Sequence, residues 1–182
     1  MYSVMKQIVS LSMLLVAGAL LFSSCDYREY APAEYPDPLL YFPAALDGVW
    51  EISSIDKHCS YTEDGSKIQI HLAVAVSGVD RKDFHAELGF APSSVNKMID
   101  DGSFPVGVLP LPEGVCSWPE DLLIPADATS VLFDLEVRKS YLKDPEFLGR
   151  KFAAALKVYS GDAETNPATE TLVVLIDPAF LF

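Results

Sequence analysis

Two acidic residues at alternate positions, Asp134 and Glu136, are the first candidates for chemistry in this chain of 182 residues. Residues two apart on a β-strand point to the same side, and glycoside hydrolysis uses a pair of carboxylates held together. Arg138 continues the same series. We therefore interpret the series as a charge-balanced exterior. The sequence also lacks the G-x-S-x-G motif of serine hydrolases, so we expect no catalytic residues.

The histidines do not form a metal-binding pattern. They are His58, His71 and His85, separated by 13 and 14 residues. One strand or helix presents a zinc site through a closer spacing, such as i, i+2 or i, i+4. His71 also falls on the polar face of its predicted strand, so we expect it to face solvent.

A set of oxygen-bearing side chains after Gly161 is similar to the start of a calcium loop. The set is Asp162, Glu164 and Asn166. Counted from Asp162, the twelfth position of such a loop holds a bidentate glutamate, whereas this chain has Val173 there. We interpret the set as a polar turn and expect neither a metal nor a cofactor.

Three aromatic residues outside the strongest strand patterns are candidates for ligand contact: Tyr61, Trp118 and Tyr141. Trp118 lies in the predicted loop Cys116-Ser117-Trp118-Pro119. A ring exposed in a loop can stack on the C–H groups of a sugar, whereas a ring turned inward covers a core. The sequence leaves both roles open for these residues.

Alternating apolar and polar residues identify the elements that would position these side chains. The clearest strands are Lys67–Val76, Val131–Arg138 and Lys151–Val158, each with one buried face. Weaker strand patterns occur at Leu39–Phe42, Val49–Ile55, Phe84–Phe90, Val106–Leu109 and Thr171–Ile176. The last of these is apolar on both faces, which favours a central position. About seven to eight short strands between turns predict an all-β sandwich.

The inward-facing positions predict the core of this sandwich. They are Ile70, Leu72, Val74, Phe133, Leu135, Phe152 and Leu156. One short helix is expected at Ser93–Asp100, opened by a serine cap.

The N-terminal residues have the pattern of a targeting segment. Lys6 is followed by the apolar run Ile8–Phe22, which is shorter than a bilayer-spanning helix and is typical of a signal peptide. The following Ser23-Ser24-Cys25 resembles the lipobox of bacterial lipoproteins. This resemblance implies cleavage before Cys25 and acylation of its thiol and new amino group.

The chain is thereby divided into three parts: a signal peptide at 1–24, an acylated cysteine with a Pro-rich tether at 25–38, and a β-sandwich domain at 39–182. We expect an outer-membrane protein held by its lipid. Asp26 resembles the signal that exports Bacteroidetes lipoproteins to the cell exterior, whereas in enteric bacteria it implies retention at the inner membrane.

Two cysteines remain once Cys25 carries lipid. Cys59 and Cys116 share an oxidising compartment and are candidates for a disulfide. That bond would close a loop of about sixty residues, worth roughly 4 kcal/mol in the chain-entropy model. Two unpaired thiols are the alternative.

Short apolar phrases in the domain resemble a known family. Leu40-Tyr41-Phe42-Pro43-Ala44 follows the tether, and Leu123-Ile124-Pro125-Ala126 precedes a strand. They are similar to the immunoglobulin-like N-terminal domain of Bacteroidetes surface lipoproteins, domain-of-unknown-function family 1735. This resemblance implies an immunoglobulin-like sandwich that often precedes glycan-cleaving or sugar-binding domains. Asp127-Ala128 stands where the family usually has Gly, and no such downstream domain follows before Phe182.

The charge balance narrows the class of partner. The chain has 13 Lys plus Arg against 26 Asp plus Glu and a formal charge of -13, which would repel a nucleic acid. An acidic surface also favours a neutral glycan over an anionic one. We expect a non-catalytic binding or adhesion module that supports glycan capture or contacts a partner surface lipoprotein. The alternative is a structural subunit of a fimbria-like assembly.

Overall fold

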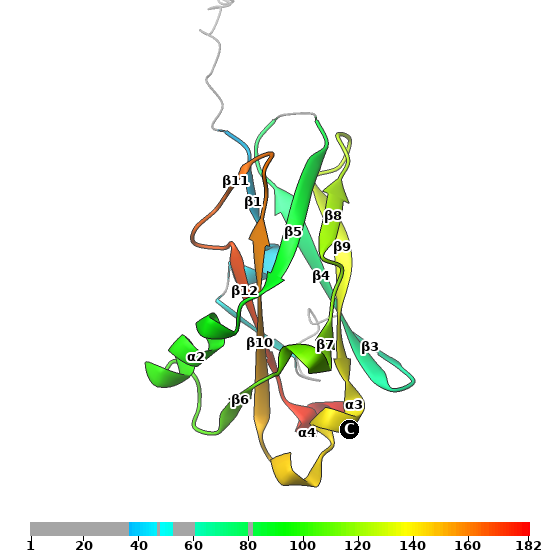
Figure 1. Cartoon of the computed structure of the whole chain (residues 1–182), viewed down its shortest axis with the longest axis vertical. Coiled ribbons are helices and arrows are strands. Elements are labelled where there is room, and N and C mark those ends of the chain that lie inside the picture. The colour runs from blue at the N-terminus through cyan, green and yellow to red at the C-terminus, as the bar shows by residue number, and fades with distance from the viewer. Residues whose placement is uncertain (1–36, 47, 53–60, 80–81) are drawn as a thin grey trace, which may run out of the picture. The chain divides into compact units, whose positions relative to one another are not determined.

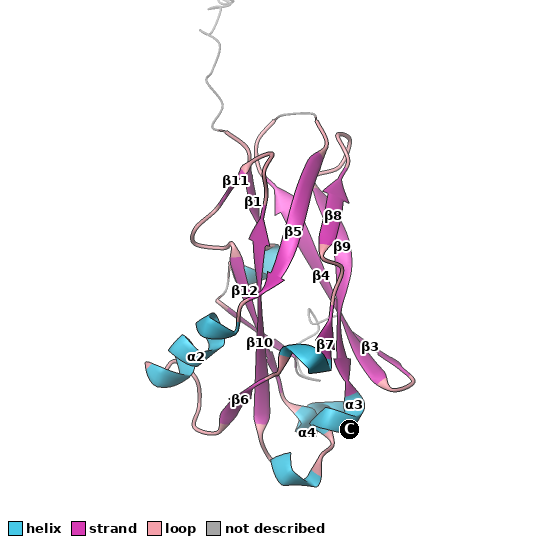
Figure 2. Ribbon diagram, in the orientation of Figure 1, coloured by secondary structure: helices cyan, strands magenta, loops and turns pink. Residues whose placement is uncertain are grey.

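The computed structural model describes residues 37–46, 48–52, 61–79 and 82–182. These residues form two β-sheets packed face to face, with a few short helices, so the predicted all-β sandwich is confirmed (Figures 1 and 2). The targeting segment, Cys25, His58 and Cys59 lie outside the described residues.

We name the first sheet sheet A. Its main path runs β11 (Glu164–Thr165), β1 (Leu39–Tyr41), β4 (Lys67–Val76), β9 (Ser130–Arg138) and β7 (Cys116–Ser117), and β3 (Tyr61–Asp64) also pairs with β4. The long antiparallel pair β4 and β9 is in register from Lys67 opposite Arg138 to Ala75 opposite Ser130. At the turn from β3 to β4, Gly65 adopts a φ of +48°, a conformation that glycine reaches without a Cβ clash.

The second sheet, sheet B, runs β2 (Val49–Ile52), β12 (Thr171–Ile176), β10 (Lys151–Tyr159), β5 (Phe84–Phe90) and β8 (Asp121–Ile124), and β6 (Val108–Pro110) also pairs with β10. Strand β1 is antiparallel to β4 in sheet A, while β2 is parallel to β12 in sheet B. The chain thus changes sheet between its first two strands, as in immunoglobulin-like sandwiches.

The sheets enclose the predicted core. Each of the seven residues expected there is at most 6 % exposed: Ile70, Leu72, Val74, Phe133, Leu135, Phe152 and Leu156. Strands β4, β5 and β12 have the predicted bounds, and β12 lies between two neighbours as its two apolar faces indicated. The predicted strand Val106–Leu109 is shifted to Val108–Pro110, and β3, β7, β8 and β11 were not predicted.

A second, smaller core lies on the outer face of sheet B, where helix α2 (Pro92–Asp100) packs (Figure 1). Val95 of the helix is 1 % exposed, and Ala153 and Ala155 of β10 are fully buried beneath it. The expectation that β10 exposes one face is therefore wrong, because α2 covers that face. The predicted serine cap is also wrong: Ala91 is the N-cap residue, without a side-chain hydrogen bond, and Pro92 opens the helix.

The remaining described helices are single turns at the ends of strands. They are η1 (Pro43–Ala45), η2 (Glu113–Val115), α3 (Lys139–Leu142), η3 (Pro145–Phe147) and α4 (Pro178–Leu181). Among the described residues, none of the helices has the length and apolar character to cross a bilayer. Elements α3, η3 and α4 gather at the lower end of Figure 1, opposite the start of β1.

Candidate functional site

The carboxylates of Asp134 and Glu136 lie together on the outer face of sheet A. Glu136 of β9 accepts hydrogen bonds from Nζ of Lys67, from Nε2 of Gln69 at 3.3 Å and from Oγ of Ser117 at 2.9 Å. These donors, Lys67 first, lower the pKa of Glu136 from its ordinary value of 4.5 to about 2. The network spans three strands, because β4, β9 and β7 are neighbours in the sheet.

The second carboxylate, Asp134, is held by the strand partner directly opposite it. Nδ1 of His71 lies 2.6 Å from Oδ1 of Asp134, within hydrogen-bond distance. His71 is therefore on the solvent side of β4, as predicted. Arg138 continues the face but donates to the carbonyl oxygen of Gly114, so the partners of the two acids are Lys67 and His71.

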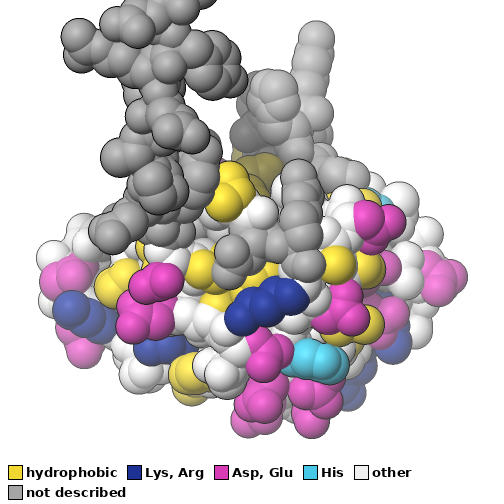
Figure 3. Space-filling model, turned by 90° about the horizontal axis from the view of Figure 1, so that it is seen from above, with side chains coloured by type: hydrophobic (Ala, Val, Ile, Leu, Met, Phe, Trp, Pro, Cys, Tyr) yellow, Lys and Arg dark blue, Asp and Glu magenta, His cyan; other side chains and the backbone are white. Residues whose placement is uncertain are grey.

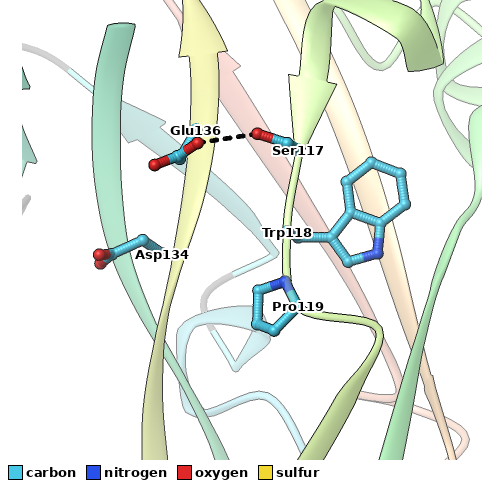
Figure 4. A pocket seen from close by; sticks show the side chains of 5 residues that line it. All are labelled: Ser117, Trp118, Pro119, Asp134 and Glu136. Carbon is cyan, nitrogen blue, oxygen red and sulfur yellow. Dashed lines mark hydrogen bonds between the residues drawn. The ribbon is translucent and has the colours of Figure 1, made fainter.

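A shallow hollow of ≈ 360 Å³ adjoins these carboxylates and is lined by Ser117, Trp118, Pro119, Asp134 and Glu136 (Figure 4). The acidic pair and Trp118, which are separate in the sequence, thus line the same hollow. In Figure 4, however, the carboxylates and the indole extend in opposite directions. The hollow offers carboxylate oxygens and a hydroxyl, and the indole ring does not face them.

Trp118 faces the interior of the sandwich. Its Nε1 donates to the carbonyl oxygen of Leu88 at 3.1 Å, and its ring stacks on Phe90 with centroids 5.5 Å apart. The ring is partly buried against the main core. Of the two roles open for this residue, the indole ring takes the role of a core lid.

The other two aromatic candidates also pack against the core, in separate elements. Tyr61 belongs to β3, and Tyr141 belongs to α3, where its ring lies 5.1 Å from that of Phe147 and 5.7 Å from that of Phe152. No ring contact joins Tyr61, Trp118 and Tyr141 within the described ranges. The three residues therefore do not make one aromatic platform.

The other candidate side chains serve local structure. Asp162 accepts a hydrogen bond from the backbone N–H of His85 at 2.9 Å, and Asn166 accepts one from Ala168. In the part of the chain that the structure describes, no three His, Cys, Asp or Glu side chains come together as a metal site. Among the described residues Cys116 has no disulfide partner, and burial raises the pKa of its thiol to about 12. Its pairing with Cys59 stays a prediction, since Cys59 is not described.

Three residues of the site were not identified from the sequence: Lys67, Gln69 and Ser117. The alternation in Lys67–Val76 placed the first two on an outer face, but only the strand register brings them beside Glu136. Ser117 lies in a two-residue strand without a periodic signal. Together these residues make a polar site with paired charges, suited to a ligand that both donates and accepts hydrogen bonds.

The chain is an immunoglobulin-like β-sandwich with a polar, hydrogen-bonded outer face on sheet A. Comparison with solved structures agrees with this fold. A "putative carbohydrate binding protein" from Bacteroides ovatus matches with a TM-score of 0.58 and 13% identity over 76% of this chain and 36% of that one. A Bacteroides ovatus protein of unknown function matches with a TM-score of 0.53 and 25% identity over 76% of this chain and 44% of that one.

A third match is a multidomain protein from Bacteroides ovatus that includes domain-of-unknown-function family 1735, with a TM-score of 0.51 and 20% identity over 75% of this chain and 43% of that one. The chain spans less than half the length of each of these three proteins. No family model and no curated protein matches the sequence. The similarity shows the fold.

Proposed function

We propose that the chain is a non-catalytic binding module that holds neutral glycans on the outer face of sheet A. The observation that carries the proposal is the hydrogen-bonded face around Glu136, where Lys67, Gln69 and Ser117 fix one carboxylate beside an open hollow. Sugars carry many hydroxyl groups, each able to donate and to accept. The side chains on this face offer both functions.

The state of Glu136 supports binding without catalysis. Glycoside hydrolysis needs one protonated carboxyl group as the acid, usually one with a raised pKa. The pKa of Glu136 is lowered to about 2, so this group is ionised at physiological pH. Asp134 would then have to be the acid, and its Oδ1 lies 2.6 Å from Nδ1 of His71. The pair is arranged to accept hydrogen bonds.

Charge supports the choice of a neutral ligand. The whole chain carries a formal charge of -13, and Glu136 of the site is paired with Lys67. An anionic polysaccharide would meet a potential of its own sign over most of the surface. A neutral glycan meets no such barrier.

One structural neighbour adds support from outside the chain. Its name refers to carbohydrate binding, and the matched segment is 36% of that protein. The name belongs to the whole neighbour, so the assignment to this domain rests on the site described above.

The proposal includes display on the cell surface. The module would be anchored in the outer membrane through acyl chains on Cys25 and would face the exterior, where it meets glycans or a partner surface lipoprotein. Cys25→Ala cells fed an alkyne fatty acid test this part. Label that persists on the variant would contradict lipidation at Cys25.

A glycan array probed with the domain tests binding. Asp134→Asn and Ser117→Ala should each weaken binding of the recognised neutral glycan by about tenfold, since each removes one hydrogen-bonding group. Asp121→Asn, on the edge strand β8 of sheet B, is the matched control and should bind as the original chain does. Trp118→Ala, Tyr61→Ala and Tyr141→Ala should act through stability, which thermal unfolding measures.

Two results would overturn the proposal. Failure to bind any neutral glycan would favour the fimbria-like subunit. Release of reducing sugar that is abolished in Asp134→Asn or Glu136→Gln would show an enzyme.

A further inference from the structure

Exposed apolar side chains gather at the end of the sandwich formed by α3, η3 and α4. Leu148 is 88% exposed, Phe182 47% and Phe180 38%. Val106, fully exposed, belongs to the same end, because a Cβ placed on the neighbouring Gly107 would lie 2.7 Å from Nη1 of Arg150. We call this region the C-terminal end patch. Clusters of exposed apolar side chains on soluble domains mark contact surfaces.

The patch surrounds a hollow of ≈ 460 Å³ that has several apolar walls. Its apolar walls include Leu142, Phe147, Leu148, Pro178, Ala179 and Phe182. The side chains of Leu148 and Phe182 stand beside it and are partly or largely in solvent. A surface with both an apolar hollow and apolar projections can accept a copy of itself.

The charges around the patch are mixed in sign. Lys143 and Arg150 line the hollow, as does Asp144, and Glu146 lies two residues beyond Asp144. Nζ of Lys143 lies 3.9 Å from the centroid of the Phe182 ring. Within the described residues, none of these four charged side chains has a salt-bridge partner. Oδ1 of Asp144 accepts a hydrogen bond from the backbone N–H of Glu146 at 3.0 Å, so its second oxygen and the other three charged groups are the ones that a partner would meet.

Acidic side chains also lie at the opposite end, where β1 begins, beside Lys82, whose Nζ donates to the carbonyl oxygen of Asp162 at 3.3 Å. Asp83 there accepts from the N–H of Ala126, Asp162 accepts from His85, and Glu164 is paired in register with Leu39. Figure 3 looks onto this end and shows acidic side chains around its rim, with Lys and Arg side chains among them. With a total charge of -13, two copies repel each other over most of their surfaces. At the C-terminal end patch, charges of both signs lie close enough for opposite charges of two copies to face each other, which would offset that repulsion locally.

We propose that the C-terminal end patch is a self-association surface that pairs with the same patch of a second copy. In a two-fold contact, each residue meets its counterpart reciprocally. Lys143 and Arg150 of one copy then face Asp144 and Glu146 of the other, while Leu148 enters the apolar hollow across the axis. The pairing leaves the β1 end of each copy, and the outer face of sheet A, away from the contact.

Sedimentation equilibrium of the chain from residue 25 onward, with Cys25→Ser to prevent acylation, tests the proposal. This chain contains the whole compact unit Tyr35–Phe182. Its apparent mass should rise toward that of a dimer between about 10 μM and about 1 mM protein, the range of weak complexes. Leu148→Asp should weaken association by at least about tenfold, whereas the matched control Leu46→Asp, 67% exposed in another part of the fold, should not.

Exchanging the charges of Arg150 and Glu146 distinguishes the loss of a specific contact between copies from a loss of folding. Arg150→Glu alone should weaken the dimer by about tenfold, because it sets like charges against each other. Adding Glu146→Arg should restore association, since opposite charges meet again across the axis. A chain that stays monomeric throughout would overturn the proposal. So would a dimer that Leu148→Asp leaves intact, or a charge exchange that restores nothing while thermal unfolding shows folded variants.

Discussion

The two sheets share one core but differ on their outer faces. On sheet A the outward side chains of β4 and β9 meet solvent and bind one another, as Lys67 and Glu136 do. On sheet B the outward residues Ala153 and Ala155 are fully buried, because α2 covers them. The same strand geometry thus gives an exposed polar face in sheet A and a buried apolar face in sheet B.

This difference decides where a site can form. A polar side chain beneath α2 would lose its water and find no partner, so the sequence places alanine and valine there. The open face of sheet A tolerates charged residues and can hold them in fixed positions through strand register.

The largest expected effect comes from one substitution made on each outer face. Ala155→Asp buries a carboxylate beneath α2 and should lower the free energy of unfolding by at least about 3 kcal/mol. Ala73→Asp, at the outer face of β4, should change it by less than about 1 kcal/mol. Urea unfolding followed by tryptophan fluorescence measures both. Equal losses would show that α2 does not protect its face of sheet B.

The inner faces should respond alike, which sharpens the comparison. Leu135 of β9 and Leu156 of β10 are both fully buried in the main core, one from each sheet. Leu135→Ala and Leu156→Ala should each lower the free energy of unfolding by about 2–5 kcal/mol through lost contacts and a cavity. A loss confined to one of them would mean that the two sheets do not share a single core.

The sequence predicts the inner faces better than the outer ones, for a physical reason. Large apolar residues such as Phe133 and Phe152 are favourable only in the interior, so their spacing predicted the strands and the core. Alanine fits exposed and buried positions alike, so Ala153 and Ala155 gave no sign of the helix above them. That cover comes from α2, about sixty residues earlier in the chain.

The candidate site was predictable only in part. Asp134 and Glu136 follow from alternation along one strand, but their partners depend on the register between strands, which periodicity does not contain. Trp118 was identified as an aromatic residue in a loop, yet the direction of its ring depends on the carbonyl group of Leu88. Contacts between segments distant in sequence thus decide both the site and its lining.

The smallest effect concerns the open face itself and appears as a pH dependence. The pKa of Glu136 is about 2 in the folded chain against an ordinary 4.5, so the unfolded chain binds more protons between these values. The stability contributed by Glu136 is therefore present above pH 4.5 and is lost as the pH falls toward 2. Because the side chain is 26% exposed, solvent screening should keep this contribution below about 1 kcal/mol.

Glu136→Gln isolates that contribution. The variant should be less stable than the original chain at pH 6, and the two should converge as the pH is lowered through this window, because protonation removes from the original what the substitution removed already. Lys67→Met should reproduce most of the convergence, since Lys67 is the largest cause of the lowered pKa. Thermal unfolding of each chain across this pH range measures the difference in stability. Parallel curves would show that the hydrogen bonds to Glu136 do not stabilise the fold.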